Sequence, residues 1–312
     1  MQEAAFSPNA RALELLSRDL IGRQASDRLP TVAQYQERLG VGSGTVQARL
    51  RLLTSIGAIR LEAHGHRGTV LVERDLSKLW SLSRLGSVRG VLPLPESLEP
   101  VTLAAILRQQ FEALKVPLEL LYLHGSDRRI GMVRDGEAHF AVTSQPAAAT
   151  ATEIDADHWS TLEFGPETYH RQDAMIVLLR PHLSTDDRIA TIGFDAQSHD
   201  HTQVTLAEFP ADLGYRYVDH PHGRLPGLLA EGLLDAAVWH RAALAIPLSA
   251  VGINVRPLHR PEAIALARAT GHAVLVTRAA CGEVVGMLKS VDLSGTRSLQ
   301  RQIELDETLP LY

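Results

Sequence analysis

The sequence predicts an α/β protein in two parts: a small N-terminal module of helices and one hairpin, and a larger C-terminal part of two α/β lobes. Its 312 residues are about twice the usual length of one domain. After residue 88, strand-like and helix-like apolar segments alternate, which is typical of parallel sheets. A glycine-bearing segment also recurs later in the chain, and this favours two similar lobes.

The composition excludes several classes of protein. Hydrophobic residues make up 45% of the chain, enough for two cores. Apolar runs fall short of the roughly 18 residues that a membrane helix needs, and the first residues lack a basic segment followed by an apolar one, so we expect neither a membrane partner nor a secretory signal. The single cysteine, Cys281, excludes an internal disulfide and favours the cytoplasm.

The charge is unevenly distributed. The net charge of −5 argues against nucleic acid as a partner, yet residues 1–75 hold ten arginines and eight acidic residues. Within residues 28–74 there are seven basic residues and three acidic ones. A basic N-terminal module therefore precedes an acidic remainder, as in proteins that bind nucleic acid with one part. A solvated helix face would give the same excess.

Three helices open the chain. Ser7-Pro8 is an N-cap followed by proline at the first helical position, and this helix extends to about Gly22. Thr31-Val-Ala-Gln34 has the pattern of a capping box, and its helix ends at Gly40. A glycine-rich turn then leads to a third helix that ends near Gly57, with Val46, Leu50 and Leu53 on one face.

A β-hairpin over residues 59–72 follows, with a polar tip from His64 to Gly68. Two short helices around a glycine-bearing turn are a helix-turn-helix. With the hairpin they predict a winged helix.

These residues resemble known families. Residues 29–72 resemble the winged-helix domain of GntR-type regulators, at Leu29-Pro30, Leu39-Gly40-Val41, Thr45-Val46, Leu50-Arg51, Gly57 and Gly68-Thr69. The whole chain is similar to the YhfZ-type family of transcriptional regulators, at Arg28-Leu29-Pro30, Ser55 to Arg60, Pro93-Leu94-Pro95 and Gly165 to Tyr169. The resemblance implies DNA binding by the N-terminal module and a C-terminal domain similar to type II periplasmic binding proteins.

On the third helix, several polar residues point away from the apolar face. Gln47 is suited to pair with adenine, whereas Arg51 lies one turn further on and is suited to hold phosphate. The candidate DNA-binding residues are Arg28, Thr31, Ser43, Gly44, Thr45, Gln47, Arg51, His66 and Arg67. A winged helix that only binds other proteins is the alternative, because GntR-type helices carry arginines where this chain has Ser43 and Gln47.

The expected boundaries are 1–74 for the DNA-binding domain, 75–87 for a linker and 88–312 for the two-lobed α/β domain. Residues 131–144 align without gaps on residues 227–240, each as a helix, a glycine and an apolar strand. Crossovers near 166–174 and 241–256 would join the lobes as in a type II periplasmic binding protein.

Ligands of open α/β sheets bind at the carboxyl ends of strands, where helix N-termini favour anions. We expect a small anionic effector in the cleft between the lobes, although the serines involved would also serve simply as helix caps. The candidate ligand-binding residues are Ser97, Ser126, Ser144, Gln145, Tyr169, Arg171, Asp195, Ser198 and Trp239.

Catalytic motifs are missing from the sequence. It has no Gly-x-Ser-x-Gly, phosphate loop or His-Glu-x-x-His pattern, and neither Lys115 nor Lys289 lies at a strand end, as a pyridoxal phosphate site would require. We therefore expect no cofactor and no enzyme. The clusters at His199/His201 and His220/His222 are interpreted as polar surface loops, and metal binding there is left open.

Together these features predict a cytoplasmic, ligand-responsive transcriptional regulator that binds a double-stranded DNA operator as a homodimer. The alternative is an α/β enzyme or solute-binding domain that carries a vestigial winged helix.

Overall fold

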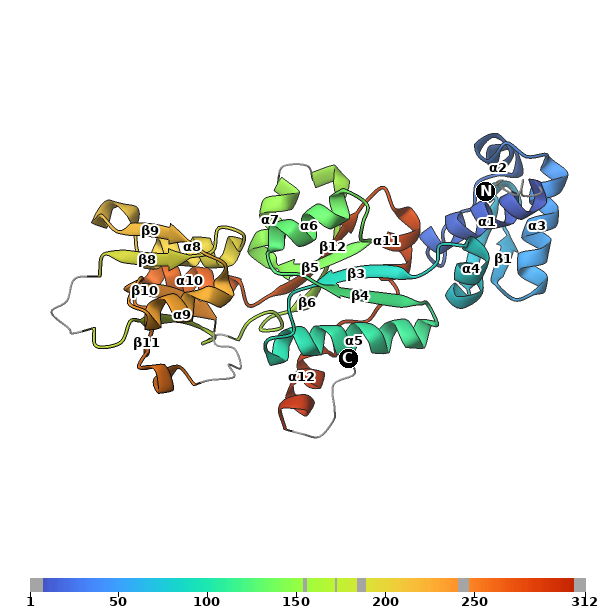
Figure 1. Ribbon diagram of the computed structural model, residues 1–312. Coiled ribbons are helices and arrows are strands. Elements are labelled where there is room, and N and C mark those ends of the chain that lie inside the picture. The colour runs from blue at the N-terminus through green and yellow to red at the C-terminus, as the bar shows by residue number, and fades with distance from the viewer. Residues whose placement is uncertain (1–7, 154–155, 172, 184–188, 241–246, 306–312) are drawn as a thin grey trace, which may run out of the picture. The chain divides into compact units, whose positions relative to one another are not determined.

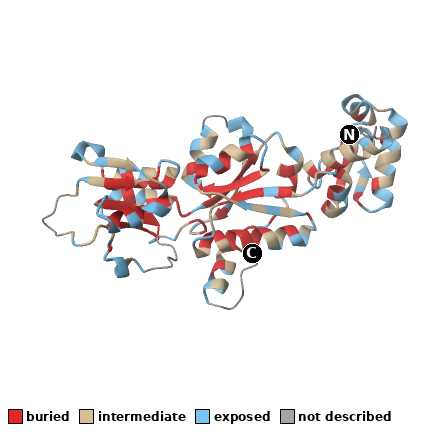
Figure 2. Ribbon diagram, viewed as in Figure 1, coloured by how far each residue is buried: buried red, intermediate tan, exposed pale blue. Residues whose placement is uncertain are grey.

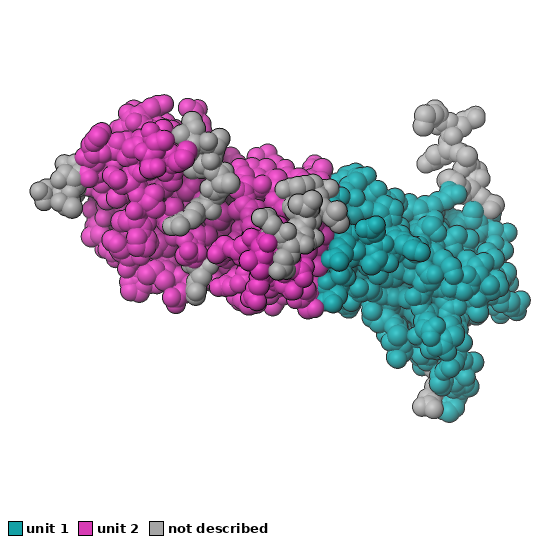
Figure 3. Space-filling view, turned by 90° about the horizontal axis from the view of Figure 1, so that it is seen from below, with its two compact units in different colours: residues 1–89, 108–119, 277–292 teal, residues 90–107, 120–276, 293–312 magenta. Residues whose placement is uncertain are grey.

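The computed structural model describes residues 8–153, 156–171, 173–183, 189–240 and 247–305. The chain divides into two compact units (Figure 3). Unit 1 comprises residues 1–89, 108–119 and 277–292, and unit 2 comprises residues 90–107, 120–276 and 293–312. None of the described helices is both long and apolar enough to cross a membrane.

The N-terminal part of unit 1 is a winged helix (Figure 1). It consists of α1 (Pro8–Gly22), α2 (Val32–Leu39), α3 (Ser43–Ser55), β1 (Ile59–Ala63), the short helix η1 (Gly65–Arg67) and β2 (Thr69–Arg74). Strands β1 and β2 pair antiparallel. Both hydrogen bonds of the predicted capping box form between Thr31 and Gln34, and Gly40 ends α2 in the left-handed conformation, with φ of 64°. The three predicted helices and the hairpin are confirmed.

The core of this module is formed by one face of each helix. Leu16 and Leu20 of α1, Tyr35 of α2 and Val46 and Leu53 of α3 are buried. Leu50, predicted on the same face of α3, is half-buried. The opposite face of α3 is left to solvent.

A half-buried carboxylate, that of Asp19, joins α1 to α2. Asp19 accepts hydrogen bonds from Tyr35 Oη (2.6 Å), from Arg23 Nε (2.7 Å) and from Arg38 (3.1 Å). Burial acts to raise the pKa of Asp19, but the hydrogen bonds from Arg23 and Tyr35 and the charges of the arginines lower it below its usual value. The ionised carboxylate therefore stabilises the angle between the two helices.

Helix α1 also packs on two elements from outside the winged helix. One is α4 (Leu76–Ser83), which lies within the segment predicted as a linker, and the other is α11 (Gly282–Leu288). A side chain on Gly286 would collide with the backbone of Gly22, so the contact between α1 and α11 requires glycine. Arg74 strengthens it by donating to the carbonyl of Gly286 at 3.0 Å.

The first lobe is built on a five-stranded sheet of order β4-β3-β5-β12-β6. The strands are β3 (Val88–Leu92), β4 (Leu118–Tyr122), β5 (Phe140–Ser144), β6 (Trp159–Gly165) and β12 (Ala273–Arg278), and β3 and β5 are parallel. The accompanying helices are α5 (Leu98–Leu114), α6 (Ser126–Arg134), α7 (Gln145–Glu153), η2 (Ala156–His158) and α12 (Thr296–Glu304).

The second lobe has a sheet of order β11-β7-β10-β8-β9, all within unit 2. Its strands are β7 (Met175–Leu179), β8 (Thr191–Phe194), β9 (Arg216–Asp219), β10 (Ala236–His240) and β11 (Asn254–Pro257). Strand β8 is parallel to β9 and β10, whereas β7 is antiparallel to β10 and β11. The helical segments are α8 (His199–Glu208), η3 (Ala211–Leu213), η4 (His222–Arg224), α9 (Leu225–Ala230), η5 (Leu248–Val251) and α10 (Pro261–Ala269). The central strands are buried in both lobes (Figure 2).

The internal repeat predicted from the sequence is confirmed. Helix α6, Gly136 and strand β5 in the first lobe correspond to α9, Gly232 and β10 in the second. Both glycines have positive φ, 80° and 72°, and each ends its helix before the strand.

The first predicted crossover is confirmed, because the chain passes from β6 to β7 within residues 166–174. The second is wrong. Residues 241–246 lie outside the described residues, and beyond them β11 extends the second sheet while α10 packs on α8. The chain returns to the first lobe only at residues 270–272, before β12. The antiparallel strand β11 covers the edge of β7, which the sequence pattern did not show.

Candidate functional site

Two surfaces have the properties of functional sites, and the first is helix α3. Ser43, Gly44, Gln47 and Arg51 are exposed on it, whereas Val46 is buried on the opposite face. Thr45 is half-buried. These exposed residues start at the N-terminal end of the helix, which in helix-turn-helix proteins contacts base edges.

The other residues predicted to contact DNA lie near α3. Arg28 is exposed and pairs with Val70 in an isolated antiparallel bridge, which places it beside the wing. The hydroxyl of Thr31 accepts a hydrogen bond from the backbone N–H of Gln34 and is therefore used as a cap. His66 is exposed at the tip of the wing, and the side chain of Arg67, in the same short helix, lies outside the described part of the chain.

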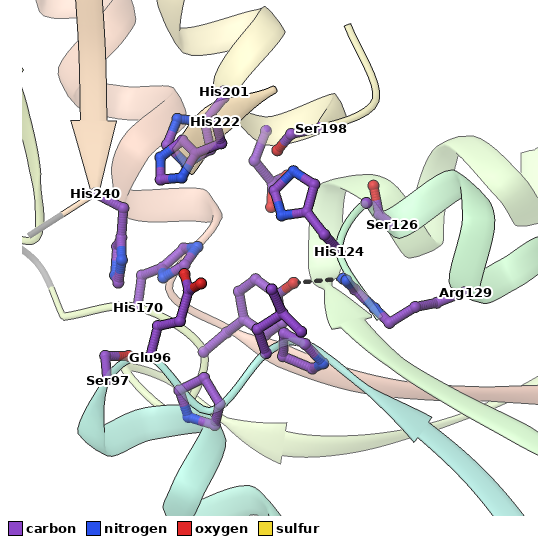
Figure 4. A pocket seen from close by; sticks show the side chains of 16 residues that line it. Glu96, Ser97, His124, Ser126, Arg129, His170, Ser198, His201, His222 and His240 are labelled. Carbon is purple, nitrogen blue, oxygen red and sulfur yellow. Dashed lines mark hydrogen bonds between the residues drawn. The ribbon is translucent and has the colours of Figure 1, made fainter. Parts of the chain in front are cut away.

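The second surface is a pocket of about 80 Å³ between the two lobes, within unit 2 (Figure 4). Its polar lining comes from both lobes and from the first crossover: Glu96, Ser97, His124, Ser126, Arg129, Tyr169, His170, Ser198, Asp200, His201, His222 and His240. The volume is enough for a small ligand and a few water molecules.

Three helices begin at this pocket. Ser97 precedes α5, Ser126 is the first residue of α6, and Ser198 is the N-cap of α8 but makes no capping hydrogen bond with its side chain. The hydroxyls of Ser97 and Ser126 are buried without a hydrogen-bond partner among the described residues. The free N–H groups at such helix starts attract negative charge.

The approach of the two lobes depends on Gly125, which has φ of 87°. A Cβ at this position would lie 2.8 Å from the carbonyl oxygen of Gln197 in the other lobe. Glycine therefore allows the loop before α6 to reach the loop before α8.

Two buried carboxylates lie on the side of the second lobe. Asp195 accepts backbone hydrogen bonds from Gln197 and His222 and lies 2.8 Å from His124 Nε2. Asp200 accepts a hydrogen bond of 2.7 Å from Ser144 Oγ, and burial raises the pKa of its carboxyl to about 6.

Arg129 supplies a buried positive charge from α6. Its guanidinium donates to the carbonyl oxygens of Val142 (3.0 Å) and Leu123 (2.8 Å) and to the hydroxyl of Tyr169 (2.7 Å). The dashed line at Arg129 in Figure 4 marks the last of these hydrogen bonds. All three acceptors are uncharged.

Four imidazoles of the pocket are held neutral. Burial, followed by repulsion from neighbouring imidazoles, lowers the pKa of His201 to about 3 and that of His170 and His222 well below its usual value. Burial alone lowers the pKa of His240 to about 4. One ring nitrogen of each of the four lacks a hydrogen-bond partner among the described residues. Because buried polar atoms are normally paired, the pocket is prepared for a polar ligand.

The rings stack in a small cluster. His222 lies flat on Trp239, with ring centroids 3.9 Å apart, and His201 meets His222 edge-on at 4.3 Å. His170 and His240 are also 4.3 Å apart. Trp239 Nε1 is buried and lacks a partner among the described residues as well.

The structure brings together part of the predicted ligand-binding set. Ser97, Ser126, Tyr169 and Ser198 line the pocket. Ser144, Asp195 and Trp239 lie one contact further back, where each touches a lining residue. Gln145 is exposed at the start of α7, and Arg171 is exposed and paired with Glu304 at 2.7 Å, so neither lines the pocket.

The sequence reasoning missed His124, Arg129, His170, Asp200 and His240. It interpreted His201 and His222 as members of surface loops, which is wrong: only 7% of the surface of each is exposed. Both follow strands of the second sheet, and this is the signal that could have placed them at the pocket. Within the described residues, no group of three or more His, Cys, Asp or Glu side chains is arranged to hold a metal ion.

Comparison with known proteins agrees with this architecture. Residues 75–312 match the YhfZ C-terminal domain, and residues 24–71 match a helix-turn-helix domain. The uncharacterized protein YhfZ of Escherichia coli (strain K12) is 28% identical over 258 residues, which cover 83% of this chain and 83% of that protein.

Two solved structures show the fold. The crystal structure of YhfZ from Shigella flexneri has a TM-score of 0.58 and 25% identity, and the match covers 76% of this chain and 97% of that one. The periplasmic aliphatic sulphonate binding protein SsuA from Escherichia coli has a TM-score of 0.50 and 12% identity, with 71% and 75% covered. The C-terminal part thus has the fold of periplasmic binding proteins. Since the family model covers most of the chain, this protein belongs to the YhfZ family.

Proposed function

We propose that this chain is a cytoplasmic transcriptional regulator whose binding to a double-stranded DNA operator is controlled by a small molecule in the cleft between the lobes. The helix-turn-helix match and the exposed polar face of α3 support DNA binding. The fold of the C-terminal part supports ligand binding. A homodimer would place two α3 helices on two operator half-sites.

The observation that carries the proposal is the set of unpartnered polar atoms in the cleft. Two serine hydroxyls and four imidazole nitrogens of the lining are buried there without protein partners among the described residues. Leaving such a group unpaired costs about 1–3 kcal/mol. A ligand that pairs them would therefore gain both affinity and selectivity.

On DNA, α3 would enter the major groove. Gln47 is exposed near its start and would contact a base edge, while Arg51, one turn later, would hold a phosphate. The side chains lie 3.5 Å apart, from Arg51 Nη2 to Gln47 Oε1, so the arginine can also orient the amide.

The test is fluorescence anisotropy with labelled promoter DNA from around the gene that encodes the protein. We expect a sequence preference and weaker binding at higher salt. Arg51→Ala should weaken binding to all sequences alike, whereas Gln47→Ala should reduce discrimination by about 1–3 kcal/mol at one base pair.

Arg216→Ala is the matched control, because it removes the same charge from an exposed position at the start of β9 in the second lobe. Binding that shows neither sequence preference nor salt dependence would refute the regulator.

The fold and the family fit a regulator rather than an enzyme. A thermal-shift screen with metabolites and metal ions separates the two classes, because a bound effector stabilises the protein without being consumed. Turnover of a stabilising compound would instead favour an α/β enzyme with a vestigial winged helix.

A further inference from the structure

The charged groups of the cleft indicate the chemical class of its ligand. Arg129 is 3% exposed, and its three acceptors are two backbone carbonyls and the Tyr169 hydroxyl. A guanidinium has five N–H donors, so two remain. A buried charge whose hydrogen-bond partners are all neutral gains free energy when an opposite charge binds beside it. Arg129 therefore favours an anion.

The serines and helix N-termini around the pocket also favour an anionic ligand. Ser126, which is 4% exposed, has an unpartnered hydroxyl, and it begins the nine-residue helix α6. Ser198 is the N-cap of the ten-residue helix α8, but its hydroxyl accepts no hydrogen bond from the first N–H groups of that helix. Donors from two lobes thus surround one small space, as in sites that hold oxyanions.

Asp200 is the exception in this set of donors. Its carboxyl lines the same pocket, is 5% exposed, and receives its hydrogen bond within the protein from Ser144 Oγ. As a carboxylate it would repel an oxyanion in a site of low dielectric constant. As a neutral acid it would donate a hydrogen bond to the same oxyanion.

On the basis of the effector site proposed above, we infer that the cleft binds a small oxyanion through Arg129 and the serine hydroxyls, and that one proton from solvent joins Asp200 as the oxyanion binds. The proton forms an O–H bond on the carboxyl group, and no other bond is made or broken. The expected ligand carries a carboxylate, sulfonate or sulfate group and fits a pocket of about 80 Å³.

Besides Asp200, the titratable groups that line the pocket are Glu96 before α5, His124 after β4, Arg129 on α6, Tyr169 and His170 in the crossover, His201 at the start of α8, His222 in η4 and His240 in β10. Asp195 lies behind this lining, and Asp127 on α6 and His199 on α8 interact electrostatically with Asp200. The imidazoles of His201 and His240 have pKa values of about 3 and 4, whereas burial raises that of Asp200 to about 6. Asp200 therefore gains a proton more readily than these two rings near neutral pH.

The experiment is isothermal titration calorimetry of the full chain with sodium sulfate, methanesulfonate and acetate, at pH 6 and pH 8 and constant ionic strength set with chloride. These probes keep their charge over this range. We expect at least one to bind, with affinity about 5- to 50-fold weaker at pH 8, as the linkage of one proton to a group of pKa near 6 requires. Repeating the titration at pH 7 in buffers of different ionisation enthalpy should show net proton uptake.

Two variants identify the groups. Asp200→Asn mimics the protonated acid, so it should bind the probe at pH 8 at least five-fold more tightly than the wild type and lose the pH dependence. Arg129→Gln should weaken binding at least ten-fold at both pH values. Arg171→Gln is its matched control, because this arginine is exposed and paired with Glu304.

Should Arg129→Gln fail to fold by circular dichroism, Ser126→Ala takes its place, with weaker binding expected at both pH values. The inference is overturned if no probe binds the wild type, if Asp200→Asn binds more weakly than the wild type, or if Arg171→Gln weakens binding as much as the cleft variant does.

DNA binding of the same samples separates this inference from the proposed function. Sequence-specific DNA binding without oxyanion binding would support the proposed regulator and refute the oxyanion site. Oxyanion binding with the Asp200 signature, but without sequence-specific DNA binding, would establish the site and refute the regulator.

Discussion

Acid is expected to destabilise unit 2 well above the pH at which carboxylates are usually protonated. His201, His222 and His240 are only 7–8% exposed, and their folded-state pKa values lie far below the ordinary value of 6.5. Below pH 6.5 the unfolded chain binds protons at these residues and the folded chain does not. Stability is therefore lost as pH falls from 6.5 toward 4.

The size of the loss follows from the same values. Between pH 7.5 and pH 5.5 each of these three histidines costs about 1 kcal/mol, and His170, whose pKa burial also lowers, adds a similar amount, for a total of about 4 kcal/mol. Asp200 acts in the opposite direction, because its folded pKa of about 6 lies above the unfolded value of 3.8, so the folded state gains protons as pH falls. Protonation of Asp200 therefore stabilises the folded state by about 1 kcal/mol, and the net loss of stability is about 3 kcal/mol. A domain has a stability of about 5–15 kcal/mol, so the loss is readily measured.

The assay is urea unfolding at pH 7.5, 6.5 and 5.5 in chloride buffers, followed by far-ultraviolet circular dichroism. His240→Asn should remove about 1 kcal/mol of the pH-dependent loss, even if it also changes the stability at pH 7.5. His66→Asn, at an exposed histidine of the wing, should leave the loss unchanged. A stability that stays constant or rises from pH 7.5 to 5.5 would refute the reasoning, and so would a His240→Asn variant with the wild-type slope.

Two further predictions concern unit 1. Gly286→Val should destabilise this unit by about 1–3 kcal/mol, because the side chain collides with Gly22 where α11 meets α1; Gly282→Ala on the same helix has open space and should have little effect in thermal unfolding. Tyr35→Phe removes the 2.6 Å hydrogen bond to the Asp19 carboxylate and should cost about 1.5–3 kcal/mol in urea unfolding. An unchanged midpoint would mean that water replaces the hydroxyl without loss.

The winged helix could be predicted from the sequence because its signals are local. The capping box of Thr31 and Gln34 and the left-handed Gly40 fix the start and end of α2 within a few residues of chain. The repeat was visible for the same reason, since each copy is a helix, a glycine and a strand in direct succession.

The cleft could be predicted only in part, because its composition depends on which strands become neighbours. Serines at helix starts were found from their local pattern. Arg129 was missed because an arginine on a helix usually faces solvent. Here its guanidinium is buried and donates hydrogen bonds to the carbonyls of Leu123 and Val142. His170 and His240 come together across the crossover only after both sheets have formed.

The net charge of the C-terminal part opposes an anionic ligand, since the chain beyond residue 75 carries 21 basic and 28 acidic residues. Exposed charges are screened by salt within about 10 Å, whereas groups inside a small pocket act on a ligand almost unscreened. The charges inside the pocket therefore determine whether an anion binds, and these are Arg129, the helix N-termini and one titratable carboxyl. Asp200 then sets the condition under which an oxyanion is accepted: the site is open to it when the carboxyl is neutral. The acidic exterior meanwhile leaves the arginine-rich stretch of residues 28–74 as the part of the chain suited to DNA.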